Sequence, residues 1–149
     1  MDNPFEAPEV EDEAPPSSDL VPLYSSMNVA GTTFLGSSLA GSVMVIANAW
    51  RRQEGVLAVV LACAVFNTVF FASAFVLPDE IPSFVYTIVS IGALRWMNDA
   101  FHGTAIAQRE LEGVPPAPWW HGLLVGLAGL FVLLGVILLA IGALVVLEV

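Results

Sequence analysis

The feature that most constrains this chain is a long apolar stretch without any charged side chain, residues 122–147, directly after His121. A helix over residues 121–147 rises 1.5 Å per residue and reaches about 40 Å, which exceeds the roughly 30 Å hydrocarbon core of a bilayer. We therefore expect this segment to cross a membrane, with tilt or with protruding ends.

The composition of the whole chain agrees with a membrane protein. Hydrophobic residues make up 57% and charged residues 12%, whereas a soluble domain contains roughly a quarter charged residues. Arginine supplies all four cations, and lysine is absent. So few cations argue against nucleic acid as a partner, because such binding depends on basic side chains at the phosphates.

The acidic residues gather at the N-terminus, where a proline-rich segment precedes the apolar part of the chain. Seven of the fourteen acids lie in the first nineteen residues. Such a segment buries too little apolar surface to offset the entropy lost on ordering. We expect residues 1–26 to be a disordered acidic tail and residues 27–149 to be the transmembrane helical domain. The tail is either an arm that binds a partner or screens charge, or a solvated spacer, and we favour the spacer.

Four apolar segments predict an all-α membrane protein, a bundle of four transmembrane helices. Polar or proline-rich breaks separate them at residues 51–55, 78–83 and 108–118. The third segment is apolar only in its first half, so a half-inserted or interfacial helix is the alternative there. The expected spans are residues 29–50, 56–77, 84–107 and 121–147.

Small residues in the first and last segments indicate close helix packing. In the first segment Gly36 precedes Ala40 by four residues, and Gly41 follows Ser37 at the same spacing. Gly122 and Gly126 form a GxxxG pattern in the last segment. Small residues at this spacing let the backbones of two membrane helices approach each other. We expect the first segment to pack against its neighbours, with a second copy or another membrane protein as partner.

The arginines predict an orientation. Arg51, Arg52 and Arg109 fall in the first and third connections, which four crossings place on one face, whereas the second connection contains only acids. Because cytoplasmic loops are enriched in arginine, we expect these connections in the cytoplasm and both chain termini outside. Trp50, at the cytoplasmic end of the first span, agrees with this orientation. No basic region of a signal peptide precedes the apolar segments.

The third segment contains a polar cluster, which is the strongest candidate for chemistry. It consists of Arg95, Asn98, Asp99 and His102. Positions 95, 99 and 102 share one helical face, so Arg95 and Asp99 can pair. Ionisable residues inside a membrane are functional candidates, for instance in a proton path with His102 as the titrating group. We favour the structural alternative, in which these residues pair with each other and point into the bundle or to its surface.

Catalytic and metal sites find no support in the sequence. It contains no nucleophile elbow, phosphate-binding loop or zinc-protease motif, so we expect no enzyme and no cofactor. The four residues His102, Glu110, Glu112 and His121 lack the spacing of metal ligands. Cys63 is the only cysteine, which excludes a disulfide within the chain. Asn48 and Asn67 are expected to hydrogen-bond between helices.

Two stretches resemble a group of small uncharacterised bacterial membrane proteins. Residues 33–41 read TFLGSSLAG and are followed by Asn48 and the Arg51-Arg52 pair; residues 102–106 read HGTAI, and residues 117–120 read APWW. The likeness extends in order over about residues 29–126. It implies a four-helix architecture in a bacterial cytoplasmic membrane, and it implies no activity. Ser37-Ser38 stands in place of the group's Gly-Pro pair, which leaves open whether the first helix is kinked, and Thr104 replaces another proline.

Two hypotheses for function follow. The first is a non-catalytic membrane protein that acts through helix contacts, as a self-associating bundle or an accessory subunit. The second is a small oligomeric transporter or proton-linked channel that uses Arg95, Asp99 and His102. The sequence identifies neither a substrate nor a partner.

Overall fold

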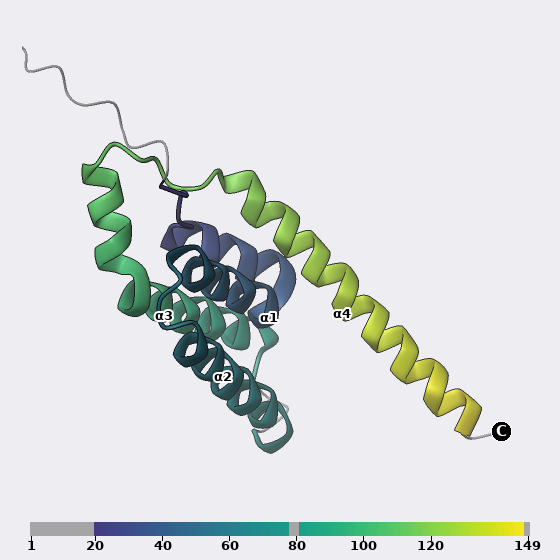
Figure 1. Ribbon diagram of the computed structural model, residues 1–149. Helices are drawn as coiled ribbons and strands as arrows, with labels where there is room; N and C mark the ends of the chain where they lie inside the picture. The colour runs from purple at the N-terminus through teal and green to yellow at the C-terminus, as the bar shows by residue number, and fades with distance from the viewer. Residues whose placement is uncertain (1–19, 78–80, 148–149) are drawn as a thin grey trace, which may run out of the picture.

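The computed structural model describes residues 20–77 and 81–147, and all its regular structure in these ranges is helical. Figure 1 shows the four helices in the expected order: α1 (Ser26–Arg52), α2 (Val56–Val76), α3 (Ser83–Leu111) and α4 (Trp119–Leu147). The prediction of an all-α fold with four helices is therefore confirmed. Residues 1–19, 78–80 and 148–149 lie outside the described residues, so the disordered tail expected over residues 1–26 lies mostly outside them.

The first helix is broken in its middle, at Ser37. This residue has φ 91° and ψ 172°, a conformation that only glycine adopts readily. Beyond the break the chain doubles back. The reversal brings Asn48 next to Tyr24, whose backbone N–H donates to Asn48 Oδ1 at 2.7 Å. A straight helix would separate these two residues by about 36 Å. The structure thus differs from the single continuous span expected over residues 29–50.

The two arms of α1 form a helical hairpin, residues 26–52, which we call the α1 hairpin. At 1.5 Å per residue, residues 26–36 extend about 16 Å and residues 38–52 about 22 Å. Each arm is shorter than the roughly 30 Å thickness of a hydrocarbon core. The two ends of the hairpin lie close together, and the tip at Ser37 lies at its opposite end.

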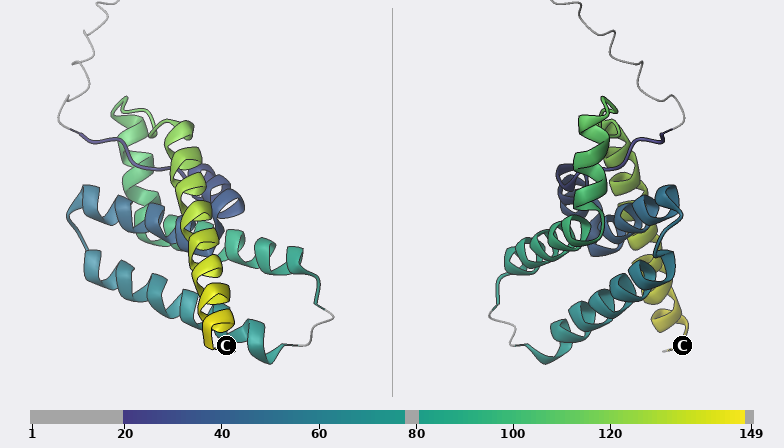
Figure 2. Two further views of the ribbon diagram at one scale, coloured as in Figure 1. Left: turned by 90° about the vertical axis from the view of Figure 1, so that its right-hand side faces the viewer. Right: turned by 60° about the vertical axis from the view of Figure 1, so that its left-hand side comes forward.

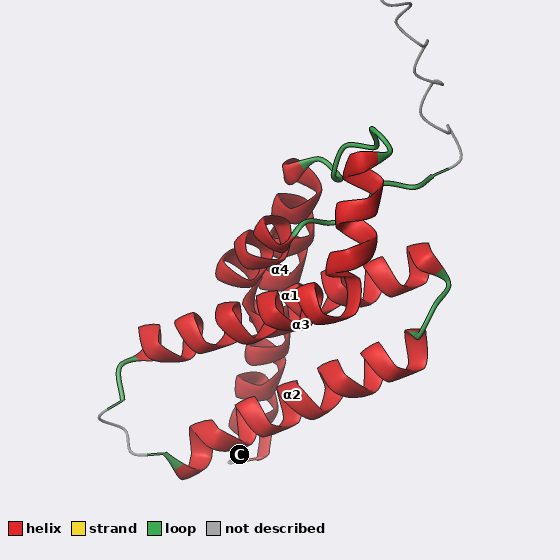
Figure 3. Cartoon of the chain, turned by 90° about the vertical axis from the view of Figure 1, so that its left-hand side faces the viewer, coloured by secondary structure: helices red, strands yellow, loops and turns green. Residues whose placement is uncertain are grey.

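The α1 hairpin is the centre of the fold, because α2, α3 and α4 all pack against it. Figures 2 and 3 show α4 crossing on one side of the hairpin and α2 with the first part of α3 on another. In its most apolar window 56% of the residues of α1 are buried, against 17% in α2. The small residues of α1 explain this position, because they let neighbouring backbones approach closely.

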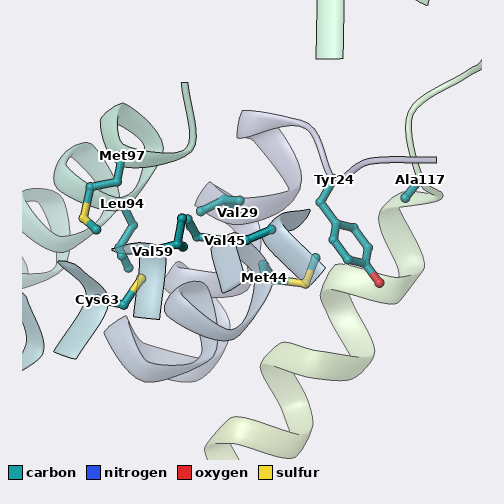
Figure 4. Close-up of a cluster of buried hydrophobic side chains, with 10 residues drawn as sticks. Tyr24, Val29, Met44, Val45, Val59, Cys63, Leu94, Met97 and Ala117 are labelled. Carbon is teal, nitrogen blue, oxygen red and sulfur yellow. The ribbon is translucent and has the colours of Figure 1, made fainter. Parts of the chain in front are cut away.

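Apolar side chains from both arms of the hairpin meet those of its neighbours in one cluster (Figure 4). Val29 comes from the first arm, and Met44 and Val45 come from the second. The other labelled members come from α2, from α3 and from the segments before α1 and α4: Val59, Cys63, Leu94, Met97, Tyr24 and Ala117. The cluster thus joins the hairpin to the helices around it.

The segment just before α1 belongs to this core, although residues up to 26 were expected in the tail. Leu23 and Tyr24 are buried, and the backbone N–H of Ala117 donates to the carbonyl of Leu23 at 2.8 Å. Ser25 caps α1, because its hydroxyl accepts from the backbone N–H of Asn28. The described segment 20–25 therefore connects the start of α1 to the start of α4.

Among the described residues, Ser26–Arg52 and Val56–Ser73 are long and apolar enough to cross a membrane by length and composition, although the break at Ser37 divides the first of them; Trp119–Gly135 is a shorter apolar stretch. α4 extends well beyond the other helices (Figure 1), and an added Cβ at Gly135 or Gly142 would meet nothing within 4 Å.

α3 runs as one helix, and Figure 2 shows its green C-terminal part turned away from its teal N-terminal part.

Candidate functional site

The polar cluster of the third helix is divided between two environments. Asn98 and His102 are buried, with 0% and 1% of their surface exposed, whereas Arg95 and Asp99 are exposed. The buried face of α3 consists of Ser90, Leu94, Met97, Asn98 and His102. This face meets the α1 hairpin, so the exposed Arg95 points away from it, whereas Asp99 lies at the edge of the contact, beside Ser26. The ion pair expected between them is not made; among the described residues the recorded ion pair joins Arg52 and Glu54.

Asn48 is at the centre of a buried hydrogen-bond network that closes the open end of the α1 hairpin. Its Oδ1 accepts from the Tyr24 backbone N–H, and its Nδ2 donates to the Tyr24 carbonyl at 2.8 Å. The same Nδ2 donates to Asn98 Oδ1 at 2.9 Å. All of the polar atoms of the Asn48 side chain are thus satisfied inside the protein, as burial requires.

Asn98 extends this network toward the first residue of α1. Its Nδ2 donates to Ser26 Oγ at 3.3 Å and to the Tyr24 carbonyl at 3.5 Å. Ser26 in turn donates its hydroxyl proton to the Asp99 carboxylate. Asp99 therefore interacts with the beginning of the α1 hairpin instead of with Arg95.

His102 joins α3 to the second arm of the hairpin through both of its ring nitrogens. Nε2 lies 3.1 Å from the Val45 carbonyl oxygen, and Nδ1 lies 3.3 Å from Nη1 of Arg52. A carbonyl only accepts and a guanidinium only donates, so Nε2 carries the proton and Nδ1 is the acceptor. The neutral Nε2–H tautomer satisfies both contacts. A charged ring would direct an Nδ1–H donor at the Arg52 donor.

Three arginines surround this network and define one end of the molecule, which we call the arginine end. Arg51 Nη2 donates to the Tyr24 hydroxyl at 2.8 Å, and its Cζ lies 4.1 Å from the centre of the Tyr24 ring, as in a cation–π contact. Arg52 Nη1 donates to the Phe101 carbonyl at 2.8 Å, and Arg109 donates to the Val21 carbonyl. The start and the end of α1 therefore share this end with the last part of α3.

The residues selected for helix packing lie where α1 meets α4, with one exception. A Cβ added to Gly36 would come within 2.3 Å of the Gly126 carbonyl oxygen, and one added to Gly122 within 2.8 Å of Thr32 Oγ1. Ala40 faces Gly129, whose added Cβ would meet the Ala40 Cβ at 2.7 Å. The exception is Gly41, where an added Cβ would meet Thr33 of the opposite arm and Leu94 of α3.

Polar side chains also fix both sides of the hairpin. Asn67 of α2 accepts from Ser38 Oγ and donates to Ser42 Oγ, both at 2.8 Å. On the other side, Thr32 Oγ1 donates to the Gly122 carbonyl of α4 at 3.0 Å. Asn28 Nδ2 donates to the Ala117 carbonyl at 2.8 Å. These contacts fit the role between helices predicted for asparagine side chains.

The contacts described above join helices to one another. No group of three or more His, Cys, Asp or Glu side chains that could hold a metal ion occurs in residues 20–77 and 81–147. His121 faces Trp120 and Tyr24 edge-on, with ring centroids 3.9 Å and 6.3 Å apart. Cys63 is buried in the core.

Sequence reasoning missed Tyr24, Ser26 and Arg52 as members of the network. The first two were assigned to the tail, and Arg52 was read only as a marker of orientation. A signal was present, because Leu23 and Tyr24 are apolar residues directly before Ser25, a residue type that favours helix starts. A search of family models, of curated proteins and of solved structures finds no match to the chain.

Proposed function

We propose that this chain is an integral membrane protein without catalytic activity, which acts through helix contacts as a self-associating bundle or as an accessory subunit. The apolar surface that its helices leave uncovered carries the proposal. α2 packs mainly against α1 and exposes large side chains such as Leu57, Val65 and Val69. Monomeric soluble proteins rarely expose apolar patches larger than a few hundred Å². Lipid is the surrounding that such helices require.

The proposed topology has three crossings, by α2, α3 and α4, with the α1 hairpin re-entering from the side where it began. A broken helix at membrane depth is tolerated only where protein or a water-filled cavity surrounds it. The packing of three helices around α1 meets this requirement. This arrangement replaces the four crossings expected from the sequence.

The arginine end then faces the cytoplasm, in keeping with the enrichment of arginine in cytoplasmic loops. The exposed rings of Trp50, Trp119 and Trp120 suit the interface at the same side. An odd number of crossings places the N-terminal segment in the cytoplasm and the C-terminus outside. The resemblance described above suggests a bacterial cytoplasmic membrane.

Cysteine labelling tests this topology on a Cys63→Ala background. Val21→Cys and Gln53→Cys flank the α1 hairpin, and Ser83→Cys marks the start of α3; all three positions are exposed. An impermeant maleimide should label the first two only in inverted vesicles and the third only in intact cells. Labelling of Val21→Cys and Gln53→Cys from opposite sides would mean that α1 crosses as a single helix.

Self-association should use the far half of α4. Gly135 and Gly142 lie seven residues apart, about two helical turns, and a Cβ added at either would meet no described atom within 4 Å. Gly135→Cys should form disulfide-linked dimers in native membranes, whereas Leu133→Cys, on the opposite face of the helix, should not. Equal cross-linking at both positions, or none in a protein that also co-purifies with no partner, would contradict the proposal.

The geometry gives less support to a proton path through Arg95, Asp99 and His102. His102 is buried and both ring nitrogens are satisfied, while Arg95 is exposed on another side of α3. An unchanged proton flux in a normally folded Asp99→Asn variant would exclude this path.

A further inference from the structure

A cavity of about 210 Å³ lies at the tip of the α1 hairpin, between α1, the last part of α2 and the first part of α3. Three phenylalanine rings form part of its wall. The rest of the wall is made by residues with hydroxyl groups: Thr33, Ser37, Ser38, Tyr86, Thr87 and Ser90. Six hydroxyl groups around one cavity are unusual for helices that otherwise expose apolar side chains.

The hydroxyl groups divide into those that the protein satisfies and those that it leaves free. Thr33 donates to the Val29 carbonyl and Ser90 to the Thr87 carbonyl, while Ser38 donates to Asn67. The side chains of Ser37, Tyr86 and Thr87 make no hydrogen bond to any described residue. These three residues are half-buried, so their hydroxyl groups are open to the cavity and available to a ligand or to water.

The backbone at Ser37 adds a second reason to expect an occupant. Its φ of 91° is unfavourable for serine, and strained residues of this kind gather at ligand sites and switch regions. The end of the first arm also leaves carbonyl groups without donors from within the helix.

The wall of the cavity defines the class of ligand. It contains no charged residue, which disfavours an ion. Hydroxyl groups both donate and accept hydrogen bonds, and the phenylalanine rings can pack against the carbon atoms of a ligand. The volume lies below the roughly 300–1,000 Å³ of sites for drug-sized ligands. We infer that the cavity at the hairpin tip binds a small uncharged solute whose hydroxyl or amide groups both donate and accept hydrogen bonds.

The inference rests on the membrane placement proposed above, and cysteine labelling separates the two. On the Cys63→Ala background, Thr87→Cys reports on the cavity, Val65→Cys on the lipid-facing side of α2, and Gln53→Cys on the aqueous connection. The probes are the neutral reagent methyl methanethiosulfonate and, as competing solutes, glycerol and urea. In membranes Thr87→Cys should react about tenfold faster than Val65→Cys, because the reaction requires water at the thiol.

Glycerol or urea should slow the reaction of Thr87→Cys and leave that of Gln53→Cys unchanged. The double substitution Tyr86→Phe and Thr87→Val removes two of the three free hydroxyls. It should abolish glycerol protection of Ser37→Cys, which provides a second reporter if Thr87→Cys folds poorly.

Each outcome decides one of the two proposals. If Thr87→Cys and Ser37→Cys react as slowly as Val65→Cys, the cavity is closed to solutes and the inference fails, although the membrane placement stands. If both react fast but neither solute protects them, the cavity holds water alone, and the inference fails as well. Labelling only by a lipid-soluble maleimide would show that a lipid tail occupies the cavity. Rapid reaction of Val65→Cys would instead overturn the membrane placement itself.

Discussion

Asn48 pairs with the backbone of Tyr24 at two points, accepting from its N–H at 2.7 Å and donating to its carbonyl at 2.8 Å. The side-chain amide thus satisfies both the N–H and the carbonyl of Tyr24, as the backbone of a paired β-strand would. The contact joins the two ends of the α1 hairpin, and the bond from Asn48 to Asn98 joins both to α3. One asparagine therefore holds three segments of the chain together.

Replacement of this residue, Asn48→Leu, should lower the free energy of unfolding by about 2–4 kcal/mol. The substitution leaves the buried N–H of Tyr24 without its partner, and each unsatisfied buried group costs about 1–3 kcal/mol. Reversible unfolding in mixed micelles, followed by circular dichroism, measures the loss. Thr68→Val is the control, because the exposed Thr68 bonds only within α2, to the Ala64 carbonyl. Similar losses in both variants would show that Asn48 does not hold the hairpin.

Ser37→Gly should stabilise the protein by about 1 kcal/mol or more, since the conformation at this position costs a non-glycine residue about 1–3 kcal/mol. Ser38→Gly should have the opposite effect, because Ser38 donates to Asn67 of α2. Thermal unfolding in detergent compares the two neighbouring variants. Destabilisation by Ser37→Gly would argue against the broken backbone.

Gly36→Ala should weaken the packing of α4 on the hairpin by about 1–3 kcal/mol, a usual cost of overpacking. The added methyl group would meet the backbone of Gly126, which has no side chain to move aside. Gly31→Ala, in the same helix, is the matched control, because a Cβ there meets nothing within 4 Å. Proteolysis of the α3–α4 connection in micelles should become faster only in Gly36→Ala. Equal rates in both variants would be evidence that the two glycines do not meet.

His102→Phe should destabilise the protein, and His121→Phe should not. The first substitution keeps a ring of similar size but removes the contacts to the Val45 carbonyl and to Arg52, at a cost of about 1–3 kcal/mol. The second removes Nδ1 of His121, a buried atom without a hydrogen-bond partner. Chemical unfolding of the two variants side by side gives the comparison, and a larger loss in His121→Phe would reverse it.

The helices could be predicted from the sequence because apolar length and proline-rich breaks are local properties. The course of α1 could not. Hydropathy measures how apolar a segment is and does not show its direction, so residues 29–50 satisfied the criterion for a span. One signal was compatible with a break: the density of glycine and hydroxyl side chains in this segment. The structure places the break at Ser37, where the sequence has no proline.

Part of the network could be predicted as well. The sequence singled out Asn98 and His102 as polar residues of the third helix, and Asn48 as a residue that bonds between helices. Their partners depended on the reversal of the chain at Ser37, because only then do Tyr24 and Ser26 reach Asn98. The spacing of Arg95 and Asp99 was compatible with an ion pair, but the face of α3 that packs on the hairpin runs through Leu94 and Asn98.

The central position of the α1 hairpin also affects how the protein is made. The hairpin is synthesised before α2, α3 and α4; in the membrane placement proposed above, its polar tip has no suitable surroundings until those helices enclose it. Gly126 and Gly129, which cover Gly36 and Ala40, are translated some ninety residues later than the residues that they cover. The α1 hairpin thus leaves the ribosome before the helices that pack on it, and truncation before α4 would leave Gly36 and Ala40 uncovered.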